Sequence, residues 1–157
     1  VESWYFTHVD ALLDEARSGP RHFRRPPLAR LVMRHLSWLE HSQGWHLPAA
    51  VIMPNHVHVL LTASSRADVR PADAVRVLRA AVAAEAERVL PHQAAALWDD
   101  RILDHGWWAP EKRGWAVRHL RDDPVRAGLT QTADTWPWGL YEATNAPHQP
   151  QEGGHTP

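Results

Sequence analysis

The segment of residues 45–62 restricts the possible folds more than any other part of the chain. Residues 45–53 form an apolar run with β-branched side chains, and residues 56–62 alternate between the two faces of an extended chain beyond Pro54-Asn55. Two such runs on either side of a tight turn predict two strands joined by that turn. The chain is therefore expected to build its core on a β-sheet.

The second of these strands places two histidines side by side. Because side chains alternate along a strand, His56 and His58 share one face, while Val57 and Val59 point to the other. Two neutral imidazoles about 6–7 Å apart along one strand face can share a divalent metal ion if a third ligand comes from elsewhere. The alternative is that both histidines are only solvated or hydrogen-bonded.

Apolar residues at helical spacing predict helices on either side of this hairpin. We expect one at residues 28–39 that Gly44 stops, one from Pro71 towards Pro91, and one over about 110–121. The last is expected to end by Asp123, because a residue before a proline disfavours helical geometry. Shorter elements are predicted at 4–9, 10–17 and 101–103, and the tail 145–157 is predicted to be disordered. Residues 1–144 are expected to form one domain.

The composition limits the possible metal ligands and partners of the protein. The 157 residues include no cysteine, so a metal ion can bind only to His, Asp, Glu, Asn or Gln side chains. No apolar stretch approaches 18 residues and no signal peptide is evident, so we expect a cytoplasmic protein without a membrane partner. The formal net charge of −1 predicts that any contact with nucleic acid is local.

Three motifs in order resemble one known family. Residues 53–61 read Met-Pro-Asn-His-Val-His-Val-Leu-Leu, residues 123–129 read Asp-Pro-Val-Arg-Ala-Gly-Leu, and residues 136–138 read Trp-Pro-Trp. These segments, and more loosely residues 98–104, resemble the REP-associated tyrosine transposases, a branch of the HUH nuclease superfamily. The resemblance spans roughly residues 10–141.

This resemblance implies a fold and an activity. The fold is α+β, an antiparallel sheet flanked by helices in a ferredoxin-like HUH nuclease domain. In such a domain His56 and His58 would hold Mg²⁺ or Mn²⁺ against a phosphate of single-stranded or hairpin DNA. A tyrosine on a late helix, five residues before the proline that corresponds to Pro124, would then attack that phosphate.

The nucleophile that the family uses is missing, because the corresponding residue is His119. Tyr5 and Tyr141 are the only tyrosines, and neither lies in the predicted late helix. Three hypotheses remain for His119: an inactive enzyme that still binds DNA, a histidine nucleophile, or a third imidazole on the metal ion.

Asp123 also has two interpretations. It stands four residues after His119 and so shares a helix face with it, which would let its carboxylate complete the metal site. Alternatively, it ends the helix before Pro124 and points to water.

Contact with DNA phosphates is expected from two groups of arginines. One group, in the loop before the first predicted helix, consists of Arg21, Arg24 and Arg25. The other, beside the predicted metal site, consists of Arg118, Arg121 and Arg126. A solvated basic face is the alternative. The Trp136-Pro137-Trp138 segment is expected to lock the C-terminal part onto the domain. A strand missing from the sheet edge would favour a homodimer.

We therefore expect a transposase-like protein that binds single-stranded or hairpin DNA, in which loss of the tyrosine impairs metal-assisted cleavage and strand transfer. The alternatives are a catalytically silent DNA-binding descendant and a metal-dependent phosphodiesterase. The latter would use water as its nucleophile, with His56, His58, His119 and Asp123 around the metal ion.

Overall fold

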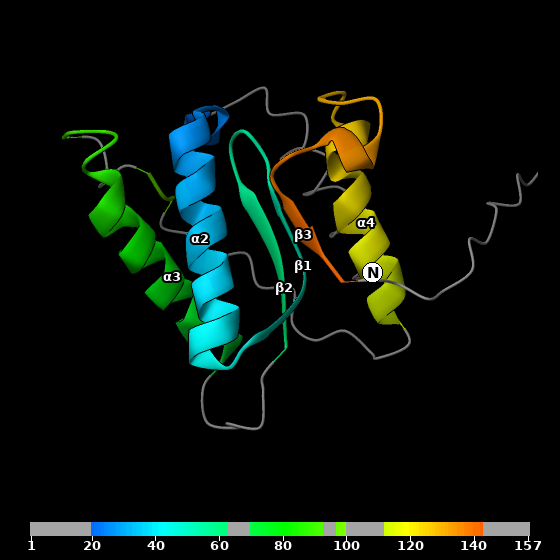
Figure 1. Cartoon of the computed structure of the whole chain (residues 1–157), viewed down its shortest axis with the longest axis horizontal. Coiled ribbons are helices and arrows are strands. Elements are labelled where there is room, and N and C mark those ends of the chain that lie inside the picture. The colour runs from blue at the N-terminus through cyan, green and yellow to red at the C-terminus, as the bar shows by residue number, and fades with distance from the viewer. Residues whose placement is uncertain (1–19, 63–69, 93–96, 100–111, 143–157) are drawn as a thin grey trace, which may run out of the picture.

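A computed structural model describes residues 20–62, 70–92, 97–99 and 112–142. In chain order its elements, labelled as in Figure 1, are η1 (His22–Arg24), α2 (Pro26–Gln43), β1 (His46–Ile52), β2 (Val57–Thr62), α3 (Pro71–Ala86), α4 (Arg113–Arg126), η4 (Ala133–Thr135) and β3 (Gly139–Tyr141). The three strands pair antiparallel in the order β2-β1-β3. The chain is thus α+β, as predicted. The ferredoxin-like arrangement stays a prediction.

The hairpin predicted for residues 45–62 is confirmed. Val51 pairs with His58 and Ile52 with Val57, and the amide of Met53 donates to the carbonyl of His56 at 2.9 Å to close the turn. The register shifts between His46 and Ala49, where β1 has one residue more than β2. This bulge leaves the turn end of the hairpin regular, which is the end that bears the histidines.

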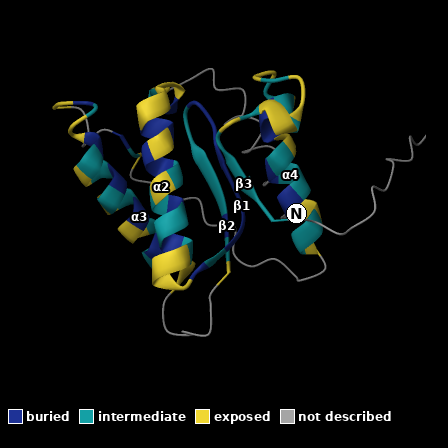
Figure 2. Ribbon diagram, viewed as in Figure 1, coloured by how far each residue is buried: buried dark blue, intermediate teal, exposed yellow. Residues whose placement is uncertain are grey.

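Helices cover both faces of the sheet (Figure 1), with α2 and α3 on one side and α4 on the other. Alternate residues of β1 supply the two apolar clusters: Ala50 and Ile52 pack under α2 and α3, whereas Ala49, Val51 and Met53 pack under α4. Figure 2 shows that β1, between the two layers, is buried. Burial on both faces explains why β1 is apolar from Leu47 onwards, whereas β2 alternates.

The first two predicted helices are present. All five apolar positions that predicted α2 are buried, and Gly44 ends the helix in the left-handed region at φ 70°; these positions are Leu28, Leu31, Val32, Leu36 and Leu39. In α3 the buried face contains Ala74, Leu78, Val82 and Ala86, and the helix ends at Ala86, before Pro91. Beyond the helix the chain forms a turn, in which the amides of Val89 and Leu90 donate hydrogen bonds to the carbonyl of Ala86.

The predicted end of the last helix is wrong. Helix α4 continues through Pro124 to Arg126. Pro124 lacks an N–H, but the turn beyond it forms hydrogen bonds from the amide of Ala127 to the carbonyl of Asp123 and from the amide of Leu129 to the carbonyl of Pro124, both at 2.9 Å. Because Pro124 is also fully buried, packing on the sheet offsets the helix bond that the proline removes.

Two hydrogen bonds to the backbone of Ile52 attach the Trp136–Trp138 segment to β1, as expected. The amide of Ile52 donates to the carbonyl of Trp138 at 2.9 Å, and Nε1 of Trp136 donates to the carbonyl of Ile52 at 3.2 Å. None of the helices in the described ranges has both the length and the apolar character that a membrane span needs. The elements predicted at 4–9, 10–17 and 101–103, and the tail 145–157, lie outside the described residues.

Candidate functional site

His56 and His58 share one face of the sheet, as their alternation predicts. Their ring centroids are 4.5 Å apart with the planes at 89°. Leu60, two residues beyond His58, packs in the cluster under α4, whereas Val57 and Val59 pack in the cluster under α2 and α3. The histidines therefore lie on the side that α4 covers. Among the described strands β2 is at an edge, and β1 is the central one.

The neighbouring Asn55 sets the orientation of the first histidine. Nδ1 of His56 lies 2.7 Å from Oδ1 of Asn55. An amide oxygen only accepts hydrogen bonds, so Nδ1 of His56 is the protonated nitrogen in this contact. The lone pair of the neutral ring is then on Nε2, and a nitrogen with a lone pair is what a metal ligand requires.

Asp123 lies beside the second histidine, inside the protein. Its side chain is fully buried on α4, and its Oδ2 lies 3.8 Å from Nε2 of His58. Its Oδ1 forms an ion pair with Nη2 of Arg126, one turn further along the helix. The alternative that Asp123 ends the helix and points to water is therefore wrong. Asp123 lies three and seven residues after the buried Leu120 and Ala116, so it shares the helix face that packs on the sheet.

His119 is on the same helix, on its partly exposed side. Its ring stacks on Trp115 with centroids 4.8 Å apart and planes at 19°. Arg126 donates from Nη1 to the carbonyl oxygen of His119 at 2.9 Å and from Nη2 to its Nε2 at 3.1 Å. The Nε2 lone pair of His119 therefore faces a guanidinium. His119 is linked to His58 through Arg126 and Asp123 in turn.

Trp115 is a feature that the sequence analysis missed. It is one of three large apolar side chains that are exposed in the described ranges, at 45%. The available signal was its position four residues before His119, which places the two rings on one helix face. The stacked pair presents an aromatic surface at the edge of α4.

The donor types of this site suit a divalent metal ion, but their arrangement is incomplete. Two imidazoles and one buried carboxylate are adjacent. Within the described ranges, however, no group of three or more His, Asp and Glu side chains is placed so that it could hold a metal ion. In addition, the Arg126 guanidinium pairs with one oxygen of the Asp123 carboxylate, so a cation at that oxygen would compete with it.

The first predicted arginine group lies next to the histidine-bearing turn. Arg21, Arg24 and Arg25 are exposed in and around η1, and the amide of Phe23 in η1 donates to the carbonyl of Pro54 at 3.1 Å. Phe23 itself is buried, so this bond and its packing fix the loop against the β1–β2 turn. The structure thus brings a basic loop to the end of the hairpin where His56 stands.

The second predicted arginine group is divided among several contacts. Arg121 pairs with Asp134 of η4, and Arg126 pairs with Asp123. Arg118 is partly buried, with its Nη1 enclosed. Of these three, only Arg126 contacts the residues around the histidine pair in the described ranges. The other two line the neighbouring side of α4.

Tyr141 does not lie where the missing nucleophile would be. It pairs with Ala49 on β3, across the central strand from β2, and belongs to the cluster under α4. Burial raises the pKa of its phenol to about 12, which disfavours the phenolate that a nucleophile needs. Tyr5 lies outside the described residues.

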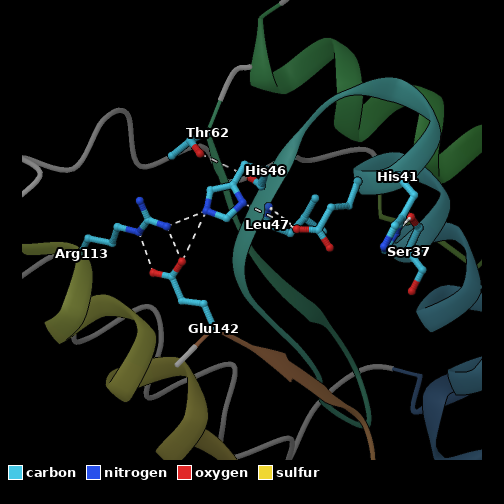
Figure 3. A network of polar contacts seen from close by, with 8 residues as sticks. Ser37, His41, His46, Leu47, Thr62, Arg113 and Glu142 are labelled. Carbon is cyan, nitrogen blue, oxygen red and sulfur yellow. Dashed lines mark hydrogen bonds and ion pairs between the residues drawn. The ribbon is translucent and has the colours of Figure 1, made fainter. Parts of the chain in front are cut away.

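A second polar cluster lies at the opposite end of the sheet (Figure 3). His46 is 3.6 Å from Oε1 of Glu40 through Nδ1 and 3.3 Å from Oε2 of Glu142 through Nε2, and Nη2 of Arg113 is 2.5 Å from Nε2 of His46. The Arg113 guanidinium, which donates to Glu142, holds the pKa of that carboxyl below its usual value. No local sequence pattern predicts this cluster, because its members are far apart in the chain.

No protein-family model matches this chain, and no curated protein and no solved structure is similar enough to it to count as a match. The geometry of the described residues is therefore the basis for assigning a function.

Proposed function

We propose that this protein binds single-stranded or hairpin DNA as a transposase-like protein whose strand-transfer chemistry is impaired. The observation on which the proposal rests is the grouping of His56, His58 and buried Asp123 on the α4 side of the sheet, beside a basic loop. Exposed arginines supply charge for phosphates, and imidazole and carboxylate donors suit a divalent cation. The expected cytoplasmic location and homodimer stay predictions.

We infer that His56, His58 and Asp123 are the ligands of a Mg²⁺ or Mn²⁺ ion. Bound there, the cation would polarise a phosphoryl oxygen of the DNA. Asp123 would have to exchange its ion pair with Arg126 for this role, since both a cation and a guanidinium compete for the same carboxylate. Arg126 would then be open to a phosphate on the side that now faces Asp123, which is the role expected for it from the sequence, while it keeps its contacts with His119.

The placement of the basic loop supports DNA as the ligand. The N-terminal end of α2, the β1–β2 turn and the C-terminal end of α4 lie at the same end of the molecule (Figure 1). Arg21, Arg24 and Arg25 are exposed there. A strand that places one phosphate near His56 would meet these three side chains with its neighbouring phosphates.

The exposed ring of Trp115 supports a preference for unpaired bases. An aromatic face accepts any unpaired base by stacking, and such stacking contributes about 1–3 kcal/mol per base. A base within a duplex is already stacked and cannot use this surface. The pair of Trp115 and His119 therefore favours single strands or the loops and ends of hairpins.

The contacts of His119 favour binding over covalent chemistry. A nucleophilic imidazole needs its lone pair directed at phosphorus, whereas Nε2 of His119 accepts from Arg126. Held in this way, the ring serves as a stacking and positioning group. We therefore expect no phosphohistidine, and a DNA-binding protein without covalent strand transfer.

The proposal is tested by titrating labelled hairpin and single-stranded oligonucleotides with and without Mn²⁺. We expect binding that Mn²⁺ strengthens, and His56→Ala should remove the Mn²⁺-dependent part. His41→Ala is the matched control, because His41 is an exposed histidine of α2 that contacts only the carbonyl of Ser37 in the described ranges. Absence of binding to every nucleic acid would refute the proposal.

A second experiment asks whether only the nucleophile is missing. His119→Tyr should produce an acid-stable covalent adduct with DNA in Mn²⁺ if the rest of the site is intact. An adduct at unmodified His119 would instead be acid-labile and base-stable, and would show that histidine is the nucleophile. An acid-stable adduct of the unmodified protein at Tyr5 or Tyr141 would contradict our placement of the nucleophile.

A second candidate function is a phosphodiesterase that uses water, and burial of Asp123 beside His58 is the observation in its favour. A buried carboxylate next to an imidazole can orient a water molecule for attack. This enzyme would cleave DNA in Mn²⁺ without trapping it. Cleavage that needs Asp123 and leaves no covalent adduct would therefore favour this candidate over the DNA-binding protein.

A further inference from the structure

Three arginines outside the two predicted groups lie on the opposite side of the sheet from the histidine pair. A groove of about 500 Å³ runs between the N-terminal half of α2 and the C-terminal end of α3. Its charged side chains are Arg30 and Arg34 from α2 with Glu85 and Arg88 from α3 and the turn that follows it. The sequence analysis did not single out any of these residues.

The charges in this groove do not cancel. Arg34 forms an ion pair with Glu85. Arg30 and Arg88 are exposed, and no ion pair joins either of them to a carboxylate in the described ranges. Two cations from different elements therefore line one groove without a counter-charge of their own, an arrangement that attracts an anion between them.

The groove lies at the same end of α2 as the basic loop. Arg24 and Arg25 directly precede α2, and Arg30 follows in its second turn. Arg30 and Arg34, four residues apart, lie on one face of α2 about 6 Å apart along the helix axis, and Arg88 lines the same groove from the turn after α3. A strand can therefore place more than one phosphate against this face. The same loop is bonded to the histidine-bearing turn through Phe23 and Pro54.

We propose that the α2–α3 groove binds the phosphate backbone of DNA outside the candidate site, with Arg30 and Arg88 as its phosphate contacts. This inference rests on the proposed function. Because α2 and α3 cover the other face of the sheet, the groove holds nucleotides that have passed around η1, and not the phosphate next to His56. An acidic protein segment is less suited, because the exposed Arg24 and Arg25 lie just before the end of α2 that lines the groove, at the proposed DNA-binding end.

The test measures how affinity for single-stranded DNA depends on salt. Each phosphate contact on a single strand contributes about −0.7 to the slope of log K against log salt concentration. For a thymidine oligonucleotide of about 20 nucleotides, longer than typical single-strand sites, the double variant Arg30→Gln/Arg88→Gln should have a slope shallower by roughly 1.4. At about 0.1 M salt its affinity should fall roughly 5- to 25-fold.

The matched control removes two charges from the other end of α3. Arg70 and Arg76 both pair with Asp73, so Arg70→Gln/Arg76→Gln removes cations that already have a partner. We expect the slope of this variant to match that of the unmodified protein. All four positions are exposed, and thermal unfolding of each variant verifies that it is folded.

The possible outcomes separate the two proposals. If the unmodified protein binds and both double variants have its slope, the groove does not contact DNA, while the proposed function stands. Equal loss in both variants would show a general charge effect and would also refute the groove. If the unmodified protein binds no nucleic acid, the proposed function is wrong, and the groove proposal falls with it.

Discussion

Replacing Asp123 with asparagine tests whether its carboxylate is only structural or is also a metal ligand. The substitution keeps the shape of the side chain and removes its charge. In the folded protein this carboxylate is fully buried, pairs with Arg126 and lies 3.8 Å from Nε2 of His58. Both roles predict that the variant is less stable without metal, so the response to added Mn²⁺ decides between them.

The size of the stability loss follows from the two side chains of the pair. Removing one partner of a fully buried ion pair costs about 3–5 kcal/mol. Arg126 is 38% exposed, so water can hydrate its guanidinium when the partner is lost. We therefore expect Asp123→Asn to lower the free energy of unfolding by about 2 kcal/mol, which corresponds to a Tm lower by roughly 4–8 °C for a domain of this size.

Added Mn²⁺ should stabilise the unmodified protein, because a cation that binds only the folded state raises its Tm. At a Mn²⁺ concentration a hundred times the Kd, the free energy of unfolding should rise by about 2.7 kcal/mol and the Tm by roughly 5–11 °C. Asp123→Asn should lose most of this gain. Arg126→Gln should show the opposite, a larger Mn²⁺ gain than the unmodified protein, because the competing guanidinium is gone.

Differential scanning calorimetry with and without Mn²⁺ measures these quantities. Glu142→Gln is the control, since it also removes a carboxylate that pairs with an arginine, at the opposite end of the sheet. Its Mn²⁺ gain should equal that of the unmodified protein. If Asp123→Asn keeps the full Mn²⁺ gain, or if Arg126→Gln loses it, Asp123 is not a ligand and its burial is structural.

Three further predictions concern other parts of the molecule. Trp115→Ala should weaken binding to single-stranded DNA by about 1–3 kcal/mol while leaving duplex affinity unchanged, as measured by fluorescence anisotropy; an equal loss for both would exclude stacking. Because the Arg113 guanidinium lowers the pKa of Glu142 in the folded state, that pair stabilises the protein above the unfolded pKa, and the contribution disappears as the pH falls through the folded one. Glu142→Gln should thus cost up to about 1 kcal/mol at neutral pH and nothing in acid, and a pH-independent difference in urea titrations would contradict this. A Cβ at Gly139 would overlap the ring of Tyr141, so Gly139→Ala should cost about 1–3 kcal/mol, and much less in a Tyr141→Ala background.

Local patterns in the sequence were enough for the elements around the site. Alternation along residues 56–62 predicted the hairpin and the shared face of His56 and His58, because side-chain direction in a strand depends only on position. Spacing of apolar residues predicted α2 in the same way. The motif at 53–61 suggested the chemistry, although nothing in the described structure tests that resemblance.

The tertiary structure alone decided how the charged residues pair. The helix rule for a residue before proline predicted that the helix ends by Asp123, and it left two interpretations open for the Asp123 side chain. Burial of Pro124 against the sheet overrode that local preference. Arginines that look alike in the sequence have different surroundings. Arg126 pairs with a buried carboxylate, whereas Arg30 and Arg88 line a groove and form no ion pair with a carboxylate of the described ranges. The local sequence determines the direction of a side chain. How strongly a charged side chain interacts depends on its burial and on partners from distant segments, which only the packed chain supplies.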